Sequence, residues 1–203
     1  MSRFTGPRLK VMRALGIDLP GLSRKTIENR PNPPGQHGAR PRRKSGFGNQ
    51  LMEKQKLRMN YGLTETQIRR LMAEAKNDRG ATGDKLAQLL ERRLDNVVFR
   101  AGFAPTIPSG RQLVNHGHFL VNGKPVNIPS YRVRIGDVIT VREKSKSLGI
   151  IKETIADPAL TRAEWLQWDD AAAKATISHL PGITDIPFPV EMQLVVEYYA
   201  TRM

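Results

Sequence analysis

The sequence contains no cysteine, few aromatic residues and far fewer acidic than basic side chains. Without cysteine the chain can form no disulfide, no thiolate zinc site and no cysteine nucleophile. No apolar run approaches the roughly 20 residues that a membrane-spanning helix needs. We also expect no signal peptide, because the N-terminus lacks an apolar core. Its Arg-rich, acid-poor start leaves an organellar presequence open, although Pro7, Gly6 and Gly16 disfavour one.

Positive charge dominates what the sequence does contain. The 203 residues hold 33 Lys and Arg against 19 Asp and Glu, for a net charge of +14 and a pI of about 10.5. Residues 1–149 carry a net +18, whereas residues 150–203 carry a net −4. This length can bury a sizeable core in one or two domains. The uneven charge predicts a nucleic-acid partner. A surface that only keeps the protein soluble does not require charge of one sign to be so unevenly placed.

The first 48 residues indicate a basic arm. A short helix is predicted from Pro7 to Leu15, with Gly16 just past its end. Residues 20–48 hold five prolines, five glycines and seven basic residues, which disfavour regular structure. We expect this segment to be mobile in the free protein and to become ordered on RNA phosphates.

Two helical regions are predicted next. Residues 49–77 look helical, and Thr64 with Gln67 forms a capping box. A second helix is predicted from Thr82 to Gly102. Its polar face would be a basic stripe about 100° wide, consisting of Lys85, Arg92, Arg93, Asn96 and Arg100. Alternatively, this face is only solvated, with arginine stems covering apolar surface.

A small α-β unit is predicted over residues 93–145. Ser109 is expected to cap a short helix that ends at Gly117 and offers free N–H groups to phosphate. We expect Arg111 on this helix to form one surface with Arg92, Arg93 and Arg100. Asn122-Gly123 predicts a hairpin. The flanking strands would be His118–Val121, Lys124–Ile128, Tyr131–Ile135 and Val138–Val141.

The rest of the chain gives weaker signals. A helix ended by Pro158 is predicted within residues 146–160. Residues 161–181, with Trp165 and Trp168, receive no assignment. The alternation over residues 190–198 fits either a strand or a short buried helix.

Several motifs lie in the same order as in a known family. They are Arg93–Ala104, Arg111–His118, Val121–Lys124 and Asn127–Val133, with Pro34–Gly38, Glu53–Arg58, Tyr61-Gly62 and Leu194–Tyr199 outside the α-β unit. In these segments the chain closely resembles the small-subunit ribosomal protein S-four family, in its bacterial or plastid form. The resemblance covers nearly the whole chain.

The resemblance implies an α+β fold. A mostly helical first domain with an irregular basic arm would comprise residues 1–92. An inserted RNA-binding domain of two helices on a short antiparallel sheet would comprise residues 93–155. Residues 156–203 would form a C-terminal segment whose end packs back on the helical domain.

The resemblance also implies a role in translation. A family member binds small-subunit (16S) ribosomal RNA directly, nucleates assembly of the subunit body and, with its neighbour S-five, contributes to translational accuracy. It works in the ribosome, in the cytoplasm or the plastid stroma.

Some features depart from the family. Certain relatives carry a four-cysteine zinc site in the arm, which His37 alone cannot replace, so we expect no metal and no cofactor. Many relatives have Arg and Ala where this chain has Ile107 and Pro108. Residues 155–187 match weakly.

Parts of the sequence also suggest functions other than RNA binding. Arg93-Leu94-Asp95 mimics the catalytic motif of pseudouridine synthases, which need a separate catalytic domain. The roughly 55 residues after the α-β unit are too few to supply that domain, so we expect no enzyme and no small-molecule substrate. We expect Asp95 instead to orient Arg92 or Arg93, or to form a helix-surface ion pair. His116 and His118 could bind a metal, although an RNA or core contact fits them better. A membrane-surface role would need one basic amphipathic helix, whereas here the basic residues are dispersed.

The predicted RNA-binding residues lie in the arm, the helices and the hairpin. They are Arg3, Arg8, Lys10, Arg13, Arg24, Lys25, Arg30, His37, Arg40, Arg42, Arg43, Lys44, Lys54, Lys56, Arg58, Lys85, Arg92, Arg93, Asn96, Arg100, Ser109, Arg111, Gln112, Asn115, His116, Asn122, Lys124, Arg132 and Arg134.

Overall fold

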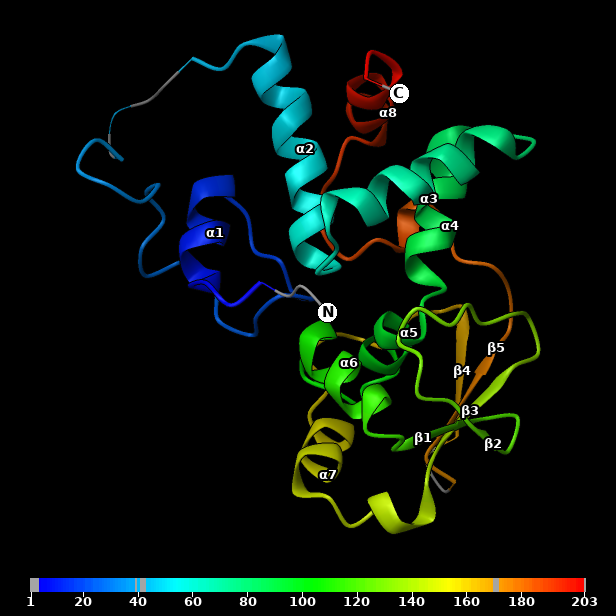
Figure 1. The fold of residues 1–203 in the computed structure, drawn as a ribbon. Helices are drawn as coiled ribbons and strands as arrows, with labels where there is room; N and C mark the ends of the chain where they lie inside the picture. Colours follow the sequence, from blue (N-terminus) through cyan, green and yellow to red (C-terminus); the bar gives the residue numbers. More distant parts are fainter. Residues whose placement is uncertain (1–3, 39, 41–42, 170–171, 203) are drawn as a thin grey trace. The chain divides into compact units, whose positions relative to one another are not determined.

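The chain folds as an α+β protein with two compact units (Figure 1). A computed structural model describes residues 4–38, 40, 43–169 and 172–202. The first unit, mostly helical, combines Met1–Leu86 with Ile186–Met203. The second unit, Ala87–Asp185, combines helices with an antiparallel sheet.

The first unit is built from helices. They are α1 (Arg8–Leu15), α2 (Gly46–Asn60), α3 (Glu65–Asn77), the first part of α4 (Thr82–Glu91) and α8 (Met192–Ala200). The predicted end of α1 is confirmed, because Gly16 adopts the left-handed conformation (φ 69°) and its N–H bonds to the Met12 carbonyl. The predicted capping box of Thr64 and Gln67 at the start of α3 is also confirmed. The expected helical region 49–77 is interrupted, since α2 ends before Tyr61 and α3 starts at Glu65.

The described residues of the arm between α1 and α2 form no helix or strand, as predicted, but the first of them are anchored. Leu19 and Leu22 are buried, and the Gly21 N–H donates to Asn60 Oδ1 at 2.9 Å. Arg13 Nε donates to the Asn32 carbonyl at 2.9 Å. Apart from this anchored start, most described residues of the arm are exposed.

The C-terminal segment returns to the first unit as a helix. Of the two structures left open for residues 190–198, the helix is the correct one. Glu53 Oε2 on α2 accepts the Glu191 N–H at 3.0 Å, and Gln50 on α2 donates to Glu197 at 3.2 Å. Tyr199 donates to Glu65 Oε1 on α3 at 2.8 Å. These bonds attach the helix to α2 and α3.

The second unit contains a five-stranded antiparallel sheet in the order β2-β1-β3-β5-β4. The strands are β1 (Phe119–Val121), β2 (Lys124–Pro125), β3 (Val138–Val141), β4 (Leu166–Asp169) and β5 (Lys174–Ile177). The helices are α5 (Leu94–Arg100), α6 (Ile107–Asn115) and α7 (Gly149–Ala156), with 3-10 turns at Glu143–Ser145 and Ile183–Asp185. The Asn122-Gly123 hairpin is confirmed, with positive φ at both residues (50° and 76°), as a type I′ turn requires.

Two predicted strands need correction, and a region without an assignment supplies two more. The strand expected over Lys124–Ile128 ends at Pro125. Tyr131–Ile135 forms no strand and contributes only an isolated bridge between Arg132 and Arg93. Residues 161–181, left unassigned from the sequence, supply β4 and β5. β5 pairs with β3, so this late segment completes the sheet. The predicted helix before Pro158 is confirmed as α7.

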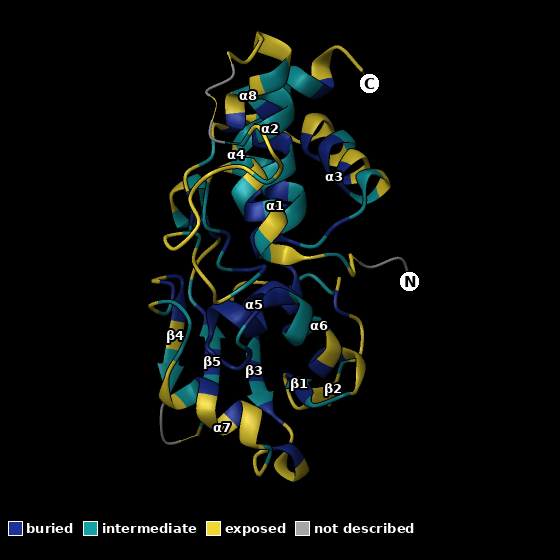
Figure 2. Ribbon diagram, turned by 90° about the vertical axis from the view of Figure 1, so that its left-hand side faces the viewer, coloured by how far each residue is buried: buried dark blue, intermediate teal, exposed yellow. Residues whose placement is uncertain are grey.

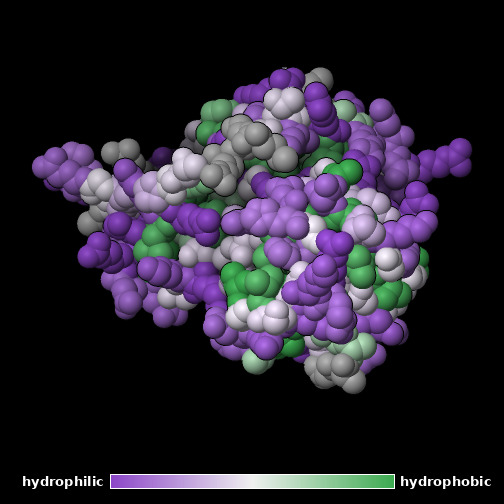
Figure 3. All heavy atoms as spheres, turned by 60° about the horizontal axis from the view of Figure 1, so that its bottom comes forward, coloured by the Kyte–Doolittle hydropathy of each residue, from purple (hydrophilic) through white to green (hydrophobic). Residues whose placement is uncertain are grey.

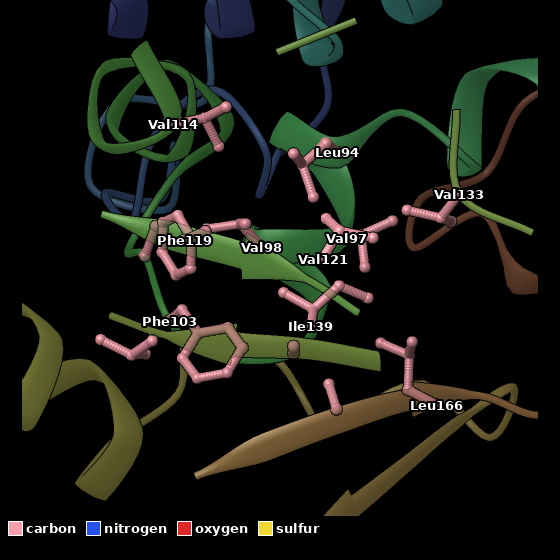
Figure 4. Packing of buried hydrophobic residues seen from close by; sticks show 14 of the residues in the cluster. Leu94, Val97, Val98, Phe103, Val114, Phe119, Val121, Val133, Ile139 and Leu166 are labelled. Atoms are coloured by element: carbon pink, nitrogen blue, oxygen red, sulfur yellow. The ribbon is translucent and has the colours of Figure 1, made fainter. Parts of the chain in front are cut away.

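One apolar core holds the second unit together (Figure 4). Side chains from α5, including Val97 and Val98, point toward Phe119 and Ile139 on the sheet. Phe103 packs against Phe119 with ring centroids 5.5 Å apart. This core fixes α5 and α6 on the sheet. It thereby also fixes the positions of the polar residues that these helices carry. Among the described residues, no helix combines the length and apolar character needed to span a bilayer.

Candidate nucleic-acid interface

The helix expected over Thr82–Gly102 is wrong, because it breaks at Arg92 and Arg93 between α4 and α5. At the break the backbone pairs with a distant segment. The Leu94 N–H donates to the Tyr131 carbonyl at 2.8 Å, and the Val133 N–H donates to the Arg92 carbonyl at 3.0 Å. Bonds to this segment replace a turn of helix, so the basic stripe calculated for one continuous helix does not exist in that form.

The break brings two arginines to one carboxylate. Asp95, fully buried in the first turn of α5, accepts Arg93 Nε at 3.1 Å and Arg93 Nη2 at 2.8 Å. Arg111 on α6 donates to Asp95 Oδ2 through Nε at 2.9 Å and Nη2 at 2.7 Å. We call Arg93, Asp95 and Arg111 the arginine clamp. The expectation that Asp95 orients Arg93 is confirmed, and Arg111 is the partner that sequence reasoning missed.

A glycine makes the clamp possible. At Gly110 on α6, a Cβ would lie 2.8 Å from the Asp95 carbonyl oxygen and 3.5 Å from Val98 Cγ1. The absence of a side chain therefore allows α6 to approach α5 closely. Figure 2 shows α5 buried along its length, whereas α6 has exposed positions beside it.

A second buried carboxylate, that of Glu91, contacts two residues predicted to bind RNA, Asn96 and Arg100. Glu91 Oε2 accepts Asn96 Nδ2 at 2.9 Å and lies 3.6 Å from Arg100 Nε. Arg100 also donates to the Asp185 carbonyl at 2.9 Å. Asn96 and Arg100 are buried, as is Arg93 of the clamp, so the main contacts of all three lie inside the unit. Sequence reasoning missed Glu91, although an acid just before two arginines was a usable signal.

The start of α6 differs from the prediction. Thr106, not Ser109, is the cap, and its hydroxyl accepts the Ser109 N–H at 3.3 Å. Pro108 fits in the first turn, where a helix needs no N–H from it. Ser109 is half-buried, whereas the more distal Gln112, Asn115 and His116 are exposed.

The hairpin and the segment that follows it contribute basic residues. Lys124 and Arg134 are exposed, and Arg132 is half-buried. The Asn122 amide donates to Asp137 Oδ1 at 2.8 Å and accepts the Val138 N–H at 2.9 Å. Asn122 therefore links the hairpin to the start of β3, a structural contribution that the sequence did not indicate.

Two histidines follow α6. His118 bonds through Nδ1 to the Ser145 hydroxyl at 2.8 Å, and its ring centroid lies 5.9 Å from that of His116. Partial burial, with the positive charges of His116 and Arg142, lowers the pKa of His118 below its ordinary value. The described part of the chain holds no group of three or more His, Asp or Glu side chains that could bind a metal.

The remaining predicted residues differ in accessibility. Lys54 is buried, with its ammonium 2.8 Å from Glu65 and 4.8 Å from the centroid of the Tyr198 ring. The half-buried ones are Arg13, Lys56, Arg58, Lys85 and Arg92. The exposed ones are Arg8, Lys10, Arg24, Lys25, Arg30, His37, Arg40, Arg43 and Lys44. Arg3 and Arg42 lie outside the described residues.

The sequence prediction also omitted several exposed basic residues. Arg142, Lys144, Lys146 and Lys152 lie on the connection from β3 into α7. Their spacing in the sequence was a visible signal, although Glu143 pairs with Lys146 at 2.9 Å. Figure 3 shows a face of the molecule on which hydrophilic side chains predominate and hydrophobic ones form small groups.

Comparison with known proteins assigns both parts of the chain. Residues 3–91 match the model of the ribosomal protein S4/S9 N-terminal domain, and residues 92–139 match that of the S4 domain. The chain is 65% identical over its full length to the small ribosomal subunit protein uS4 of Methylobacillus flagellatus, which it also covers completely. It is 62% identical over the full length of both chains to uS4B of Nitrosomonas europaea. The plastid-type uS4c of Cyanophora paradoxa is 47% identical over 98% of this chain and 100% of its own.

An S4 RNA-binding domain following a helical ribosomal domain places the chain among the structural proteins of the small ribosomal subunit. The chain belongs to the uS4 family.

Proposed function

We propose that this chain binds small-subunit ribosomal RNA directly, through the second unit and the basic arm. The arginine clamp is the observation that carries the proposal. Arg93 and Arg111 place two positive charges around one negative charge, so the clamp keeps a net positive charge. Asp95 occupies the Nε and Nη2 donors of both arginines, so the clamp would attract phosphate through its net positive charge, mainly at Arg111, whose side chain is 18% exposed.

Other exposed side chains of the second unit complete the proposed surface. Gln112 and Asn115 can bond to 2′-hydroxyl groups or unpaired bases, while Lys124 and Arg134 provide charge. Rigidly placed phosphate contacts favour the shape of a folded RNA junction over a base sequence. The exposed arm residues would add salt-sensitive contacts with the same RNA.

In the cell, we propose that this binding nucleates assembly of the subunit body. We further propose that the chain, together with S-five, contributes to translational accuracy in ribosomes of the cytoplasm or a plastid. No catalysis is required. Asp95, the residue that mimics a pseudouridine synthase aspartate, is fully buried and bonded to two arginines. A catalytic carboxylate needs access to its substrate, which supports a binding protein rather than an enzyme.

Affinity measured against salt concentration tests the proposal. The probes are a helical junction from small-subunit ribosomal RNA and a plain RNA duplex of equal length. We expect tighter binding to the junction, and affinity for both that falls steeply as salt rises. Equal affinity for the two RNAs, or little salt dependence, would contradict the proposal.

A further inference from the structure

The arginine clamp combines three features that ordinary charge attraction does not require. Its carboxylate is fully buried, while the Arg93 and Arg111 side chains keep 8% and 18% of their surface exposed. Each arginine donates two hydrogen bonds to Asp95, so each guanidinium plane is fixed. The backbone is fixed as well, since the Asp95 N–H donates to the Pro129 carbonyl at 3.1 Å.

Asp95 opposes non-specific RNA binding by charge, because it lowers the net positive charge of the clamp. It also holds two mutually repelling guanidinium groups at one fixed separation. From these two effects we propose that Asp95 is a positioning residue that determines the preference for junction RNA over duplex. This inference rests on the proposed RNA-binding function.

The two effects predict opposite changes in two affinities. Substituting Asp95→Asn keeps the shape of the side chain and raises the net charge by one. Duplex binding depends mainly on net charge, so it should stay the same or strengthen. Junction binding depends on where the guanidinium groups point, so it should weaken. A purely structural role for Asp95 would weaken both.

The test measures the affinity of the full chain for the two RNA probes at one salt concentration. We expect Asp95→Asn to reduce the ratio of junction to duplex affinity at least tenfold. The matched control is Glu164→Gln, which removes the same charge from an exposed position in the same unit and should leave the ratio unchanged. An unchanged ratio in Asp95→Asn overturns the inference.

A second variant covers the case in which Asp95→Asn does not fold. Arg111→Lys keeps the charge but loses the fork that bonds twice to Asp95. We expect it to lower the ratio of junction to duplex affinity, and a wild-type ratio would overturn the inference. A wild-type protein without any preference for the junction would instead contradict the proposed function itself, which keeps the two failures distinguishable.

Discussion

The arginines of the clamp should stabilise the fold as well as bind RNA. Asp95 has no exposed surface, and its partners are Arg93, Arg111 and the Asn96 N–H at 3.0 Å. Replacing both arginines with methionine leaves a buried carboxylate without a counter-charge. Breaking a buried ion group in this way typically costs about 3–5 kcal/mol. Arg111→Met alone should cost less, about 1–3 kcal/mol, because Arg93 keeps its two hydrogen bonds.

A third substitution separates charge from packing. Adding Asp95→Leu to the double variant removes the last charge of the group. Apolar side chains often replace a buried ion group without loss of stability, so the triple variant should recover most of the lost free energy of unfolding. Neither the double nor the triple variant should bind RNA as tightly as the wild type.

Urea unfolding followed by tryptophan fluorescence measures these changes. Both tryptophans, Trp165 and Trp168, lie in the second unit, so their emission reports on that unit alone. The control is Lys124→Met with Arg134→Met, an equal loss of charge at exposed positions. It should change stability by no more than about 0.5 kcal/mol for each substitution. A double clamp variant as stable as this control, or a triple variant no more stable than the double, would refute the reasoning.

Two further predictions concern the first unit. Amide exchange on the free protein should be fast over residues 24–44 and slow at Leu22, which is buried; strong protection throughout 24–44 would show an arm already packed without RNA. Partial burial raises the pKa of Glu65, but hydrogen bonds from Lys54 and Tyr199 outweigh it and lower the pKa below its ordinary 4.5. A lowered pKa stabilises the fold above pH 4.5, and this contribution is lost as pH falls, so wild type should lose more stability in acid than Glu65→Gln. Circular dichroism against urea at several pH values measures the difference, and parallel losses would contradict it.

Local signals in the sequence predicted those elements whose boundaries depend on nearby residues. Gly16 ends α1 and Thr64 starts α3 as expected. Asn122-Gly123 forms the hairpin because this pair readily adopts positive φ. Each of these features needs only a few consecutive residues, so sequence alone was sufficient.

Long-range contacts decided what the sequence could not predict. Helix periodicity continued through Arg92 and Arg93, but bonds to residues 131–133 broke the helix there. β5 gains its place by pairing with β3, far away in the chain. For the same reason, some basic residues make contacts in the structure that the sequence did not predict. Arg100 is buried on Glu91, whereas Arg111 reaches Asp95 from another helix.

A chemical footprint of the full chain on its own small-subunit ribosomal RNA tests the central claim most directly. The account predicts protection of backbone positions at a helical junction, and loss of part of that protection when Arg111 is replaced with alanine. Protection spread evenly along helical duplexes, or confined to transfer RNA, would contradict it.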